Sequence, residues 1–423
     1  MPVFNPIEEK ARQQRLKELR GELHGIFDDV VRDKLSDILK SVFSHVRTTD
    51  TATLERIKNS IVCLCTYGES DSSIINLKNV VSGNIGELEE AVVNSLPRRK
   101  IAVMLPHMKL YGGIRRFLEL GNHMLARNHD YRLYCIDKTN LGWFDYEGAI
   151  YPLDHILNEE FDVVMSGGVK TFPFFDQVKA KLKILHVIGR LSYKRVYDEY
   201  YKKDDLVLVG NSSDWRRYFP YMDGYTVPGA VNCEFFSPMS ISKKDSKFVV
   251  MSYGRPGQLK GFEIVIEAMR MLDKSKFKLL LFNDTAVDTT YSGIDVEYAL
   301  TKSQKDLRET YCSADLFVAM EEDGGWSNTS IEAMSCGLPL ICNKVGTCDF
   351  AIPYETAIVI PDSNPCEIAS AIQLMAEHND LRYGMAEKAI SMANKFSWAK
   401  YCTDIEKVFH MELDLKGNNN GQK

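Results

Sequence analysis

The sequence predicts an α/β protein with two doubly wound, Rossmann-like domains and a mostly helical N-terminal extension. Three observations predict this fold. The chain has 423 residues, enough for two or three domains. Short apolar runs alternate with helix-patterned segments over 99–238, and the alternation returns over 239–396. Alternation of this kind indicates parallel sheets covered by helices on both faces.

The first alternating region, 99–238, contains a glycine pair at a position where ligands bind in such folds. Its expected strands are 99–105, 131–136, 161–166, 183–188 and 206–210. Gly112 and Gly113 follow the first of these strands and open the predicted helix 113–126. Ligands of doubly wound sheets bind beyond the carboxyl ends of the strands. The glycine pair alone is a weak signal, because any tight turn can use it.

The second alternating region, 239–396, follows the polar stretch 241–247, which suits a domain boundary. Its expected strands are 247–253, 277–282, 316–320, 338–342 and 356–360, and its last two helices are 368–377 and 381–394. A final helix is expected at 396–409. The polar residues at 413–423 predict a disordered tail.

Residues 1–98 are predicted to form a separate helical extension. Apolar residues recur at helical spacing between Leu16 and Phe43. Residues 1–50 carry as many Lys and Arg as Asp and Glu, which argues against a basic helix lying on a membrane surface. The region contains no recognised motif. We expect it to pack on the catalytic core, and formation of a homo-oligomer through these helices remains open.

Composition excludes several classes of protein. The net charge of −6 and the pI of about 5.9 disfavour a nucleic-acid-binding surface. No apolar run approaches the roughly twenty residues of a membrane span, and the N-terminus lacks the apolar core of a secretory signal. Ten cysteines are scattered without a C-x-x-C pair, which favours reduced thiols over disulfides or zinc. We therefore expect a cytoplasmic protein without a metal site.

The loop that follows the predicted strand 247–253 is typical of an anion site. The strand ends at Gly254, and an apolar-periodic helix begins near Gly261. Free N–H groups and the helix dipole favour negative charge at such a helix start. Arg255 and Lys260 lie in the loop, and a planar guanidinium and a point charge both suit phosphate oxygens. Alone, this segment fits equally a turn whose lysine points into solvent.

A second candidate site follows the predicted strand 316–320. Gly324 and Gly325 allow backbone conformations that a Cβ atom forbids. Three good helix N-cap residues come next, and their amides can face a ligand: Ser327, Asn328 and Thr329. We expect Glu332 in the first turn of the helix that follows. There it either complements the helix dipole or accepts hydrogen bonds from a diol such as a ribose.

Five segments resemble, in the correct order, the motifs of one enzyme family. They are GNSSDWRRYF at 210–219, VPGAVNCEFFSP at 227–238, YGRPGQLKG at 253–261, LRETYCSADLFVAM at 307–320 and WSNTSIEAMSCGLPLI at 326–341. The family is that of the retaining GT-B glycosyltransferases related to glycogen synthase, also called group 1. The resemblance covers roughly residues 99–412, and five pieces in series are a much stronger signal than any one of them.

The resemblance implies a GT-B fold whose two domains face a cleft. Residues 99–238 would form the acceptor domain, completed by a C-terminal helix at 397–412, and 239–396 the nucleotide-sugar donor domain. The implied reaction moves a hexosyl or deoxyhexosyl group from a nucleotide-diphosphate sugar to a hydroxyl of a glycan, glycan-lipid or glycoprotein, with retention. No cofactor besides the donor substrate is implied, and the sequence has no D-x-D motif for a metal. Peripheral association with the inner face of a membrane stays open.

The resemblance also distributes roles among residues. It places Gly113 near the donor phosphates, His186 near the donor sugar and Glu332 at the nucleotide. Arg255 and Lys260 would be arranged around the charge that develops on the leaving diphosphate. The predicted catalytic residues are thus Arg255, Lys260 and His186. The predicted donor-binding residues are Gly113, Gly254, Ser327, Asn328, Thr329 and Glu332.

The sequence departs from the family pattern at one position. The family often has two glutamates in an E-x7-E spacing, but counting back eight positions from Glu332 leads to Gly324. Glu321 and Glu322 lie two or three positions too early. The W-S-N-T sequence resembles a subset of these transferases in which the first acid is missing. No glutamate is therefore assigned a catalytic role.

Three other functions are compatible with parts of the sequence. A nucleotide-sugar 2-epimerase-like enzyme would share the two-domain frame, although the G-R-x4-K-G loop favours a transferase. An NAD-dependent oxidoreductase would need G-x-G-x-x-G after the first strand, which residues 110–114 do not supply. A non-catalytic partner subunit could keep the fold without the first glutamate.

Overall fold

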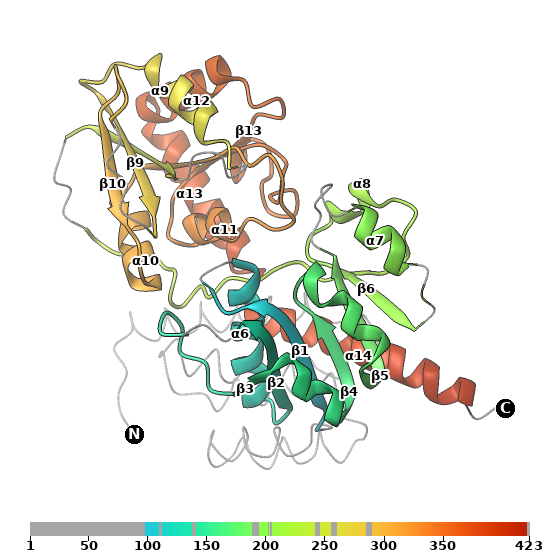
Figure 1. Cartoon of the computed structure of the whole chain (residues 1–423). Coiled ribbons are helices and arrows are strands. Elements are labelled where there is room, and N and C mark those ends of the chain that lie inside the picture. The colour runs from blue at the N-terminus through green and yellow to red at the C-terminus, as the bar shows by residue number, and fades with distance from the viewer. Residues whose placement is uncertain are drawn as a thin grey trace, which may run out of the picture.

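A computed structural model of the chain describes residues 98–420, except 110–111, 138–140, 188–193, 202, 204, 242–245, 255–259 and 285–289. The chain forms two lobes, each built around one parallel sheet (Figure 1). The helical extension predicted over 1–98 lies outside the described residues but for its last residue, so it stays a prediction.

The first lobe contains a seven-stranded sheet in which every pair of neighbours is parallel. Its strands are β1 (Lys100–His107), β2 (Asp130–Asp137), β3 (Ala149–Pro152), β4 (Glu160–Ser166), β5 (Lys179–Val187), β6 (Leu206–Gly210) and β7 (Tyr225–Thr226). The strand order is β3-β2-β1-β4-β5-β6-β7, so the chain reverses its direction of winding between β1 and β4. The sequence did not predict β3 and β7, which form the two edges of the sheet.

Helices cover this sheet on both sides. They are α6 (Gly112–Ala126), α7 (Lys194–Tyr201), the short α8 (Trp215–Tyr218) and the 3-10 helices η1 (Leu153–Asn158) and η2 (Val169–Asp176). The central strands are apolar on both faces because each face packs against helices: residues 101–105 of β1 are fully buried. Two apolar clusters, one on each face, form the core of the lobe.

The second lobe contains a six-stranded sheet, again parallel throughout. Its strands are β8 (Phe248–Tyr253), β9 (Phe277–Asn283), β10 (Val296–Leu300), β11 (Leu316–Ala319), β12 (Leu340–Cys342) and β13 (Ala357–Val359). Its helices are α9 (Phe262–Arg270), α10 (Gln304–Ser313), α11 (Asn328–Ser335), α12 (Pro365–Glu377) and α13 (Asn379–Ala393). The strand order is β10-β9-β8-β11-β12-β13, and the winding reverses between β8 and β11.

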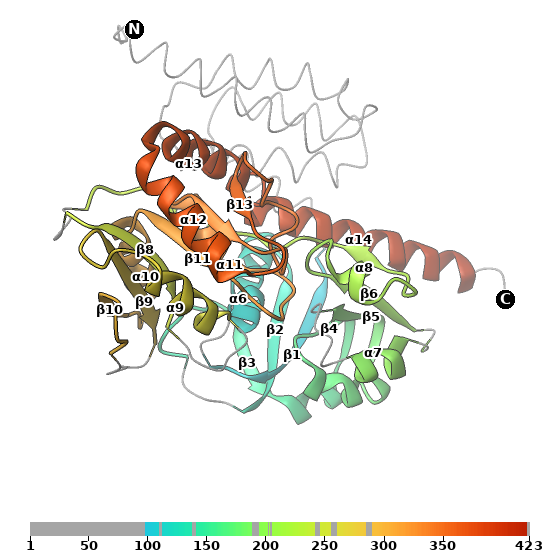
Figure 2. The same ribbon diagram turned by 90° about the horizontal axis from the view of Figure 1, so that it is seen from above.

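The last helix, α14 (Trp398–Asn420), returns from the second lobe to the first and packs against α6 and β5 (Figures 1 and 2). Its apolar side chains, including Trp398 and Phe409, join the core of the first lobe. On the same helix, the Glu406 carboxylate accepts hydrogen bonds from Arg127 and is 2.8 Å from His129. All three side chains are buried.

Helix α14 continues to Asn420, whereas the sequence predicted a disordered tail from residue 413. Two contacts hold the helix at the point where the tail was expected to begin. Leu413 packs against the core of the first lobe, and the Tyr225 hydroxyl donates to the Glu412 carboxylate over 2.7 Å. Each further residue costs little once a helix has formed, because propagation is far easier than nucleation.

The two sheets confirm the predicted fold class of two doubly wound, Rossmann-like domains. In such folds ligands bind beyond the carboxyl ends of the central strands, at the point where the winding reverses. In the second lobe this point lies beyond β8 and β11, which are the strands that precede the two candidate sites of the sequence analysis.

Candidate functional site

The loop beyond β8 carries a lysine directly over the end of β11. Gly261 has a left-handed backbone (φ 67°), and a Cβ atom there would lie 1.9 Å from the Met320 carbonyl oxygen, so only glycine fits. This close approach brings the Lys260 ammonium to 2.6 Å from the Glu321 carboxylate. Gly254 ends β8 as predicted, and Arg255 lies outside the described residues.

Glu321 follows β11 and is the acid that the sequence analysis set aside. Its side chain is 3% exposed, and Tyr253 and Ser327 donate hydrogen bonds to Oε1 over 2.9 and 2.7 Å. Lys260 pairs with the other oxygen. A Cβ atom at Gly324 would lie 3.1 Å from that oxygen, so Glu321 reaches the place to which the E-x7-E spacing pointed.

Helix α11 begins at Asn328, and Ser327 is its N-cap residue. The Ser327 hydroxyl makes no capping bond to the helix, and it donates a hydrogen bond to Glu321. The first backbone N–H groups of α11 therefore have no side-chain cap from Ser327. Thr329 contacts the Tyr253 hydroxyl, which ties the helix start to β8.

Glu332 lies in the second turn of α11, whereas the sequence analysis expected it in the first turn. The difference arises because the helix begins earlier than predicted, at Asn328. Its carboxylate is buried, and Arg115 of α6 forms an ion pair with Oε1. The Tyr311 hydroxyl donates to Oε2 over 3.3 Å. Placed away from the helix end, Glu332 does little to complement the helix dipole, an effect that falls off within the first turn.

The start of α6 in the first lobe lies against the start of α11 in the second lobe. A Cβ atom at Gly112 would lie 2.5 Å from Asn328 Nδ2, so glycine allows the two helices to approach. A Cβ atom at Gly113 would meet nothing within 4 Å, which leaves open space beside this residue. Two helix N-termini from different lobes thus face one another, and both favour negative charge between them.

His186 is the penultimate residue of β5, at the carboxyl end of this strand. Its ring is 4% exposed and packs edge-on against Phe117 at 5.1 Å. Neither ring nitrogen has a hydrogen-bond partner among the described residues. Burial, and then the charge of Arg116, lower the pKa of His186 to about 3, so the imidazole is neutral near pH 7. Such a ring can exchange a hydrogen bond with a substrate hydroxyl.

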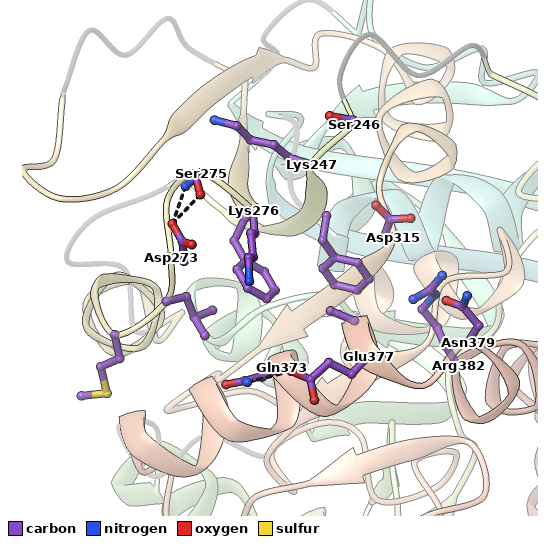
Figure 3. A pocket seen from close by; sticks show the side chains of 15 residues that line it. Ser246, Lys247, Asp273, Ser275, Lys276, Asp315, Gln373, Glu377, Asn379 and Arg382 are labelled. Carbon is purple, nitrogen blue, oxygen red and sulfur yellow. Dashed lines mark hydrogen bonds between the residues drawn. The ribbon is translucent and has the colours of Figure 1, made fainter.

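A cavity of about 830 Å³ lies at the amino ends of the strands of the second sheet (Figure 3). Its lining includes Phe248 and Phe277, which are the first residues of β8 and β9, and Asp315, which precedes β11. Lys247 and Arg382 add charges to its wall. Because this cavity lies at the amino ends of the strands, it is separate from the crevice in which doubly wound sheets bind ligands.

In the described part of the chain, no group of His, Cys, Asp and Glu side chains has the arrangement of a metal site. No helix in that part is long and apolar enough to cross a membrane.

The sequence of the second lobe matches a known family. Residues 247–378 match the model of the family described as glycosyl transferases group 1. D-inositol 3-phosphate glycosyltransferase of Corynebacterium kroppenstedtii is 24% identical over 182 residues, which are 38% of this chain and 40% of that protein. The chain thus spans less than half the length of this curated relative.

Solved structures share the whole two-lobed fold. Sucrose-phosphate synthase of Thermosynechococcus elongatus superposes with a TM-score of 0.61 at 17% identity, over 74% of this chain and 99% of that one. Anabaena HepE, in a complex with UDP-glucose, superposes with a TM-score of 0.59 at 14% identity, over 74% and 100% of the two chains. The fold is GT-B, as the sequence predicted.

The structure brings together most of the predicted donor-site residues and adds two that the sequence analysis did not select. Lys260, Ser327 and Thr329 are linked through Glu321 and Tyr253, and Asn328 approaches Gly112 of the other lobe. The two additional residues are Arg115 and Glu321, each paired with a predicted residue. Glu321 had a local signal, because it directly follows a buried strand at the point where winding reverses. Arg115 had only its place one turn after the glycine pair.

Proposed function

We propose that the protein is a retaining glycosyltransferase that moves a sugar from a nucleotide-diphosphate sugar to a hydroxyl of a glycan, glycan-lipid or glycoprotein, without a metal ion or other cofactor. The observation that carries this proposal is the group of contacts beyond β8 and β11. There Lys260 pairs with Glu321, Ser327 gives the start of α11 no side-chain cap, and the buried Glu332 reaches Arg115 of α6. HepE, whose structure contains UDP-glucose, has the same fold and supports this class of donor.

The proposed chemistry needs stabilisation of a leaving group. Negative charge grows on the diphosphate as the bond to the anomeric carbon breaks. Lys260 and the N–H groups that begin α11 are held by Gly261 and by the Tyr253–Thr329 contact before the reaction starts. Donors preorganised in this way lower the barrier because they need no reorganisation during the reaction. Glu332 would accept hydrogen bonds from the ribose diol.

The acceptor would bind on the first lobe. The neutral, buried His186 would hydrogen-bond a hydroxyl of the transferred sugar, in agreement with its unpartnered nitrogens.

The lobes also meet at Ser213, whose N–H donates to the Asp349 carboxylate over 2.9 Å. Contact between the lobes excludes water, which otherwise competes with the acceptor for the sugar. In a retaining reaction the acceptor attacks from the face that the nucleotide leaves, and a phosphate oxygen takes its proton.

A thermal-shift screen with UDP, GDP and ADP tests the proposed donor class. A ligand at about 100 times its Kd should stabilise the folded protein by about 2.7 kcal/mol, which raises the melting temperature by several degrees. One of the three diphosphates should give this shift. Protection by none of them would contradict the proposal. Nucleotide release that requires an acceptor would then separate a transferase from an epimerase or a non-catalytic subunit.

Glu332→Gln should raise the Kd of the diphosphate selected in this screen by about tenfold or more, the scale of a hydrogen bond to a charged group. Calorimetric titration measures this change, and Glu309→Gln on the exposed face of α10 is the matched control. If Glu332 served only its buried ion pair with Arg115, its loss would destabilise the fold and leave the Kd unchanged.

A further inference from the structure

A charged contact between the two lobes occupies the proposed nucleotide site. Arg115 is the fourth residue of α6 in the first lobe, and its guanidinium pairs with Glu332 of the second. The guanidinium also lies over the Phe236 ring, 5.8 Å from the centroid. The Arg115 side chain is 17% exposed and that of Glu332 is 3% exposed. This buried pair is far less screened by solvent than a surface pair.

Both oxygens of Glu332 have partners. Arg115 pairs with Oε1, and the Tyr311 hydroxyl donates to Oε2. A ribose diol needs these oxygens as acceptors, so it competes with the guanidinium for them. Lys260 is held in the same manner by Glu321. Each of these two cations is thus paired with a carboxylate, and a diphosphate that binds either of them must draw it away from that carboxylate.

We propose that Arg115 gates the donor site: it competes with the ribose for Glu332, and when the donor binds, its guanidinium exchanges the carboxylate for the diphosphate. The proposal rests on the proposed function, because it presupposes that a nucleotide diphosphate binds beside Glu332. It goes further in giving a residue of the first lobe a direct part in donor binding, which couples occupancy of the site to contact between the lobes.

The exchange follows from the cost of burying a charge. Burial lowers the pKa of Arg115, which shows that this environment disfavours a lone cation. Glu119, one turn along α6, also attracts the guanidinium. A nucleoside that took Glu332 would remove the ion-pair partner and leave only the attraction of Glu119, and a buried charge that is incompletely compensated is unfavourable. A diphosphate removes this cost because its oxygens accept bidentate hydrogen bonds from a guanidinium. Arg115 should therefore oppose binding of a nucleoside and favour binding of its diphosphate.

Arg115→Gln provides the test. The probes are the diphosphate that the wild-type protein binds and its nucleoside: UDP and uridine, GDP and guanosine, or ADP and adenosine. The variant should bind the nucleoside about threefold or more tightly than the wild type, because the competitor for Glu332 is gone. It should bind the diphosphate about tenfold or more weakly, because a charged hydrogen-bond donor is lost. Calorimetry gives the Kd of the diphosphate, and an NMR titration gives that of the nucleoside.

Arg270→Gln, at the exposed end of α9, is the matched control and should change neither constant. Opposite shifts for the two probes support the gate. Shifts in the same direction, or none, overturn it even when the wild type binds a diphosphate normally. If the wild type binds no diphosphate, the proposed function fails first. Should Arg115→Gln not fold, Arg115→Lys, which keeps the charge but loses the planar fork, must show the same two shifts at smaller size.

Discussion

Lys260→Ala should lower the rate of sugar transfer by roughly 10²–10³-fold, the effect of losing one donor that stabilises charge in a transition state. The fold should survive, because Tyr253 and Ser327 still donate hydrogen bonds to the Glu321 carboxylate that Lys260 leaves. The rate of nucleotide release, measured with saturating donor and acceptor, reports the change. Circular dichroism shows whether the variant is folded.

Lys276→Ala is the control for this variant. Lys276 is exposed and borders the cavity at the amino ends of the strands of the same sheet. Its loss removes a positive charge far from the proposed donor site, which lies beyond the carboxyl ends. Its turnover should match that of the wild type. Near-normal turnover of the folded Lys260→Ala protein would show that the lysine does not act on the leaving group.

Glu406→Gln should destabilise the protein by about 3–5 kcal/mol, the usual cost of removing one partner from a buried ion pair. The substitution leaves Arg127 buried without the carboxylate that neutralises it. Denaturant unfolding measures the loss, and Asp404→Asn is the control on the same helix. Asp404 pairs with the partly exposed Lys400, so its loss should cost about 1 kcal/mol or less. Equal denaturant concentrations at the unfolding midpoints of Glu406→Gln and the wild type would contradict the stabilising role of Glu406.

The effect of Glu406→Gln should also depend on pH. Burial alone would raise the pKa of the Glu406 carboxyl, but Arg127 and His129 outweigh burial and lower it to about 2. A carboxyl whose pKa is lower in the folded state stabilises the protein above its unfolded pKa, about 4.3. That contribution is lost as the pH falls from about 4.3 towards 2. The stability difference between variant and wild type should therefore be constant near pH 7 and shrink in this acidic range.

Much of the fold could be predicted from the sequence, because most strands of both sheets are buried and read as apolar runs. The strands that were not predicted lie at the edges of the sheets. β3 contains Pro152, β7 has two residues, and β10 is only partly buried. An edge strand is paired on one side only, so its apolar signal is weak. The length of α14 was also underestimated, since its last turns are polar.

The candidate site was predictable only where its residues follow the strands that hold them. Lys260 and Glu332 belong to segments with a strand, a glycine turn and a helix in sequence order. Glu321, the partner of Lys260, follows a predicted strand in the same way, but the partner of Glu332 could not be derived from its own segment. The pair between Arg115 and Glu332 joins residues far apart in the chain, and it depends on how the two lobes face each other. No local pattern in the sequence records that arrangement.

A crystal structure of the protein with the nucleotide diphosphate selected in the screen tests the central claim most directly. We expect the diphosphate between Lys260 and the start of α11, the ribose hydroxyls on the Glu332 carboxylate, and the Arg115 guanidinium on a phosphate oxygen. A nucleotide bound elsewhere, for instance in the cavity at the amino ends of β8 and β9, would contradict the assignment of the donor site.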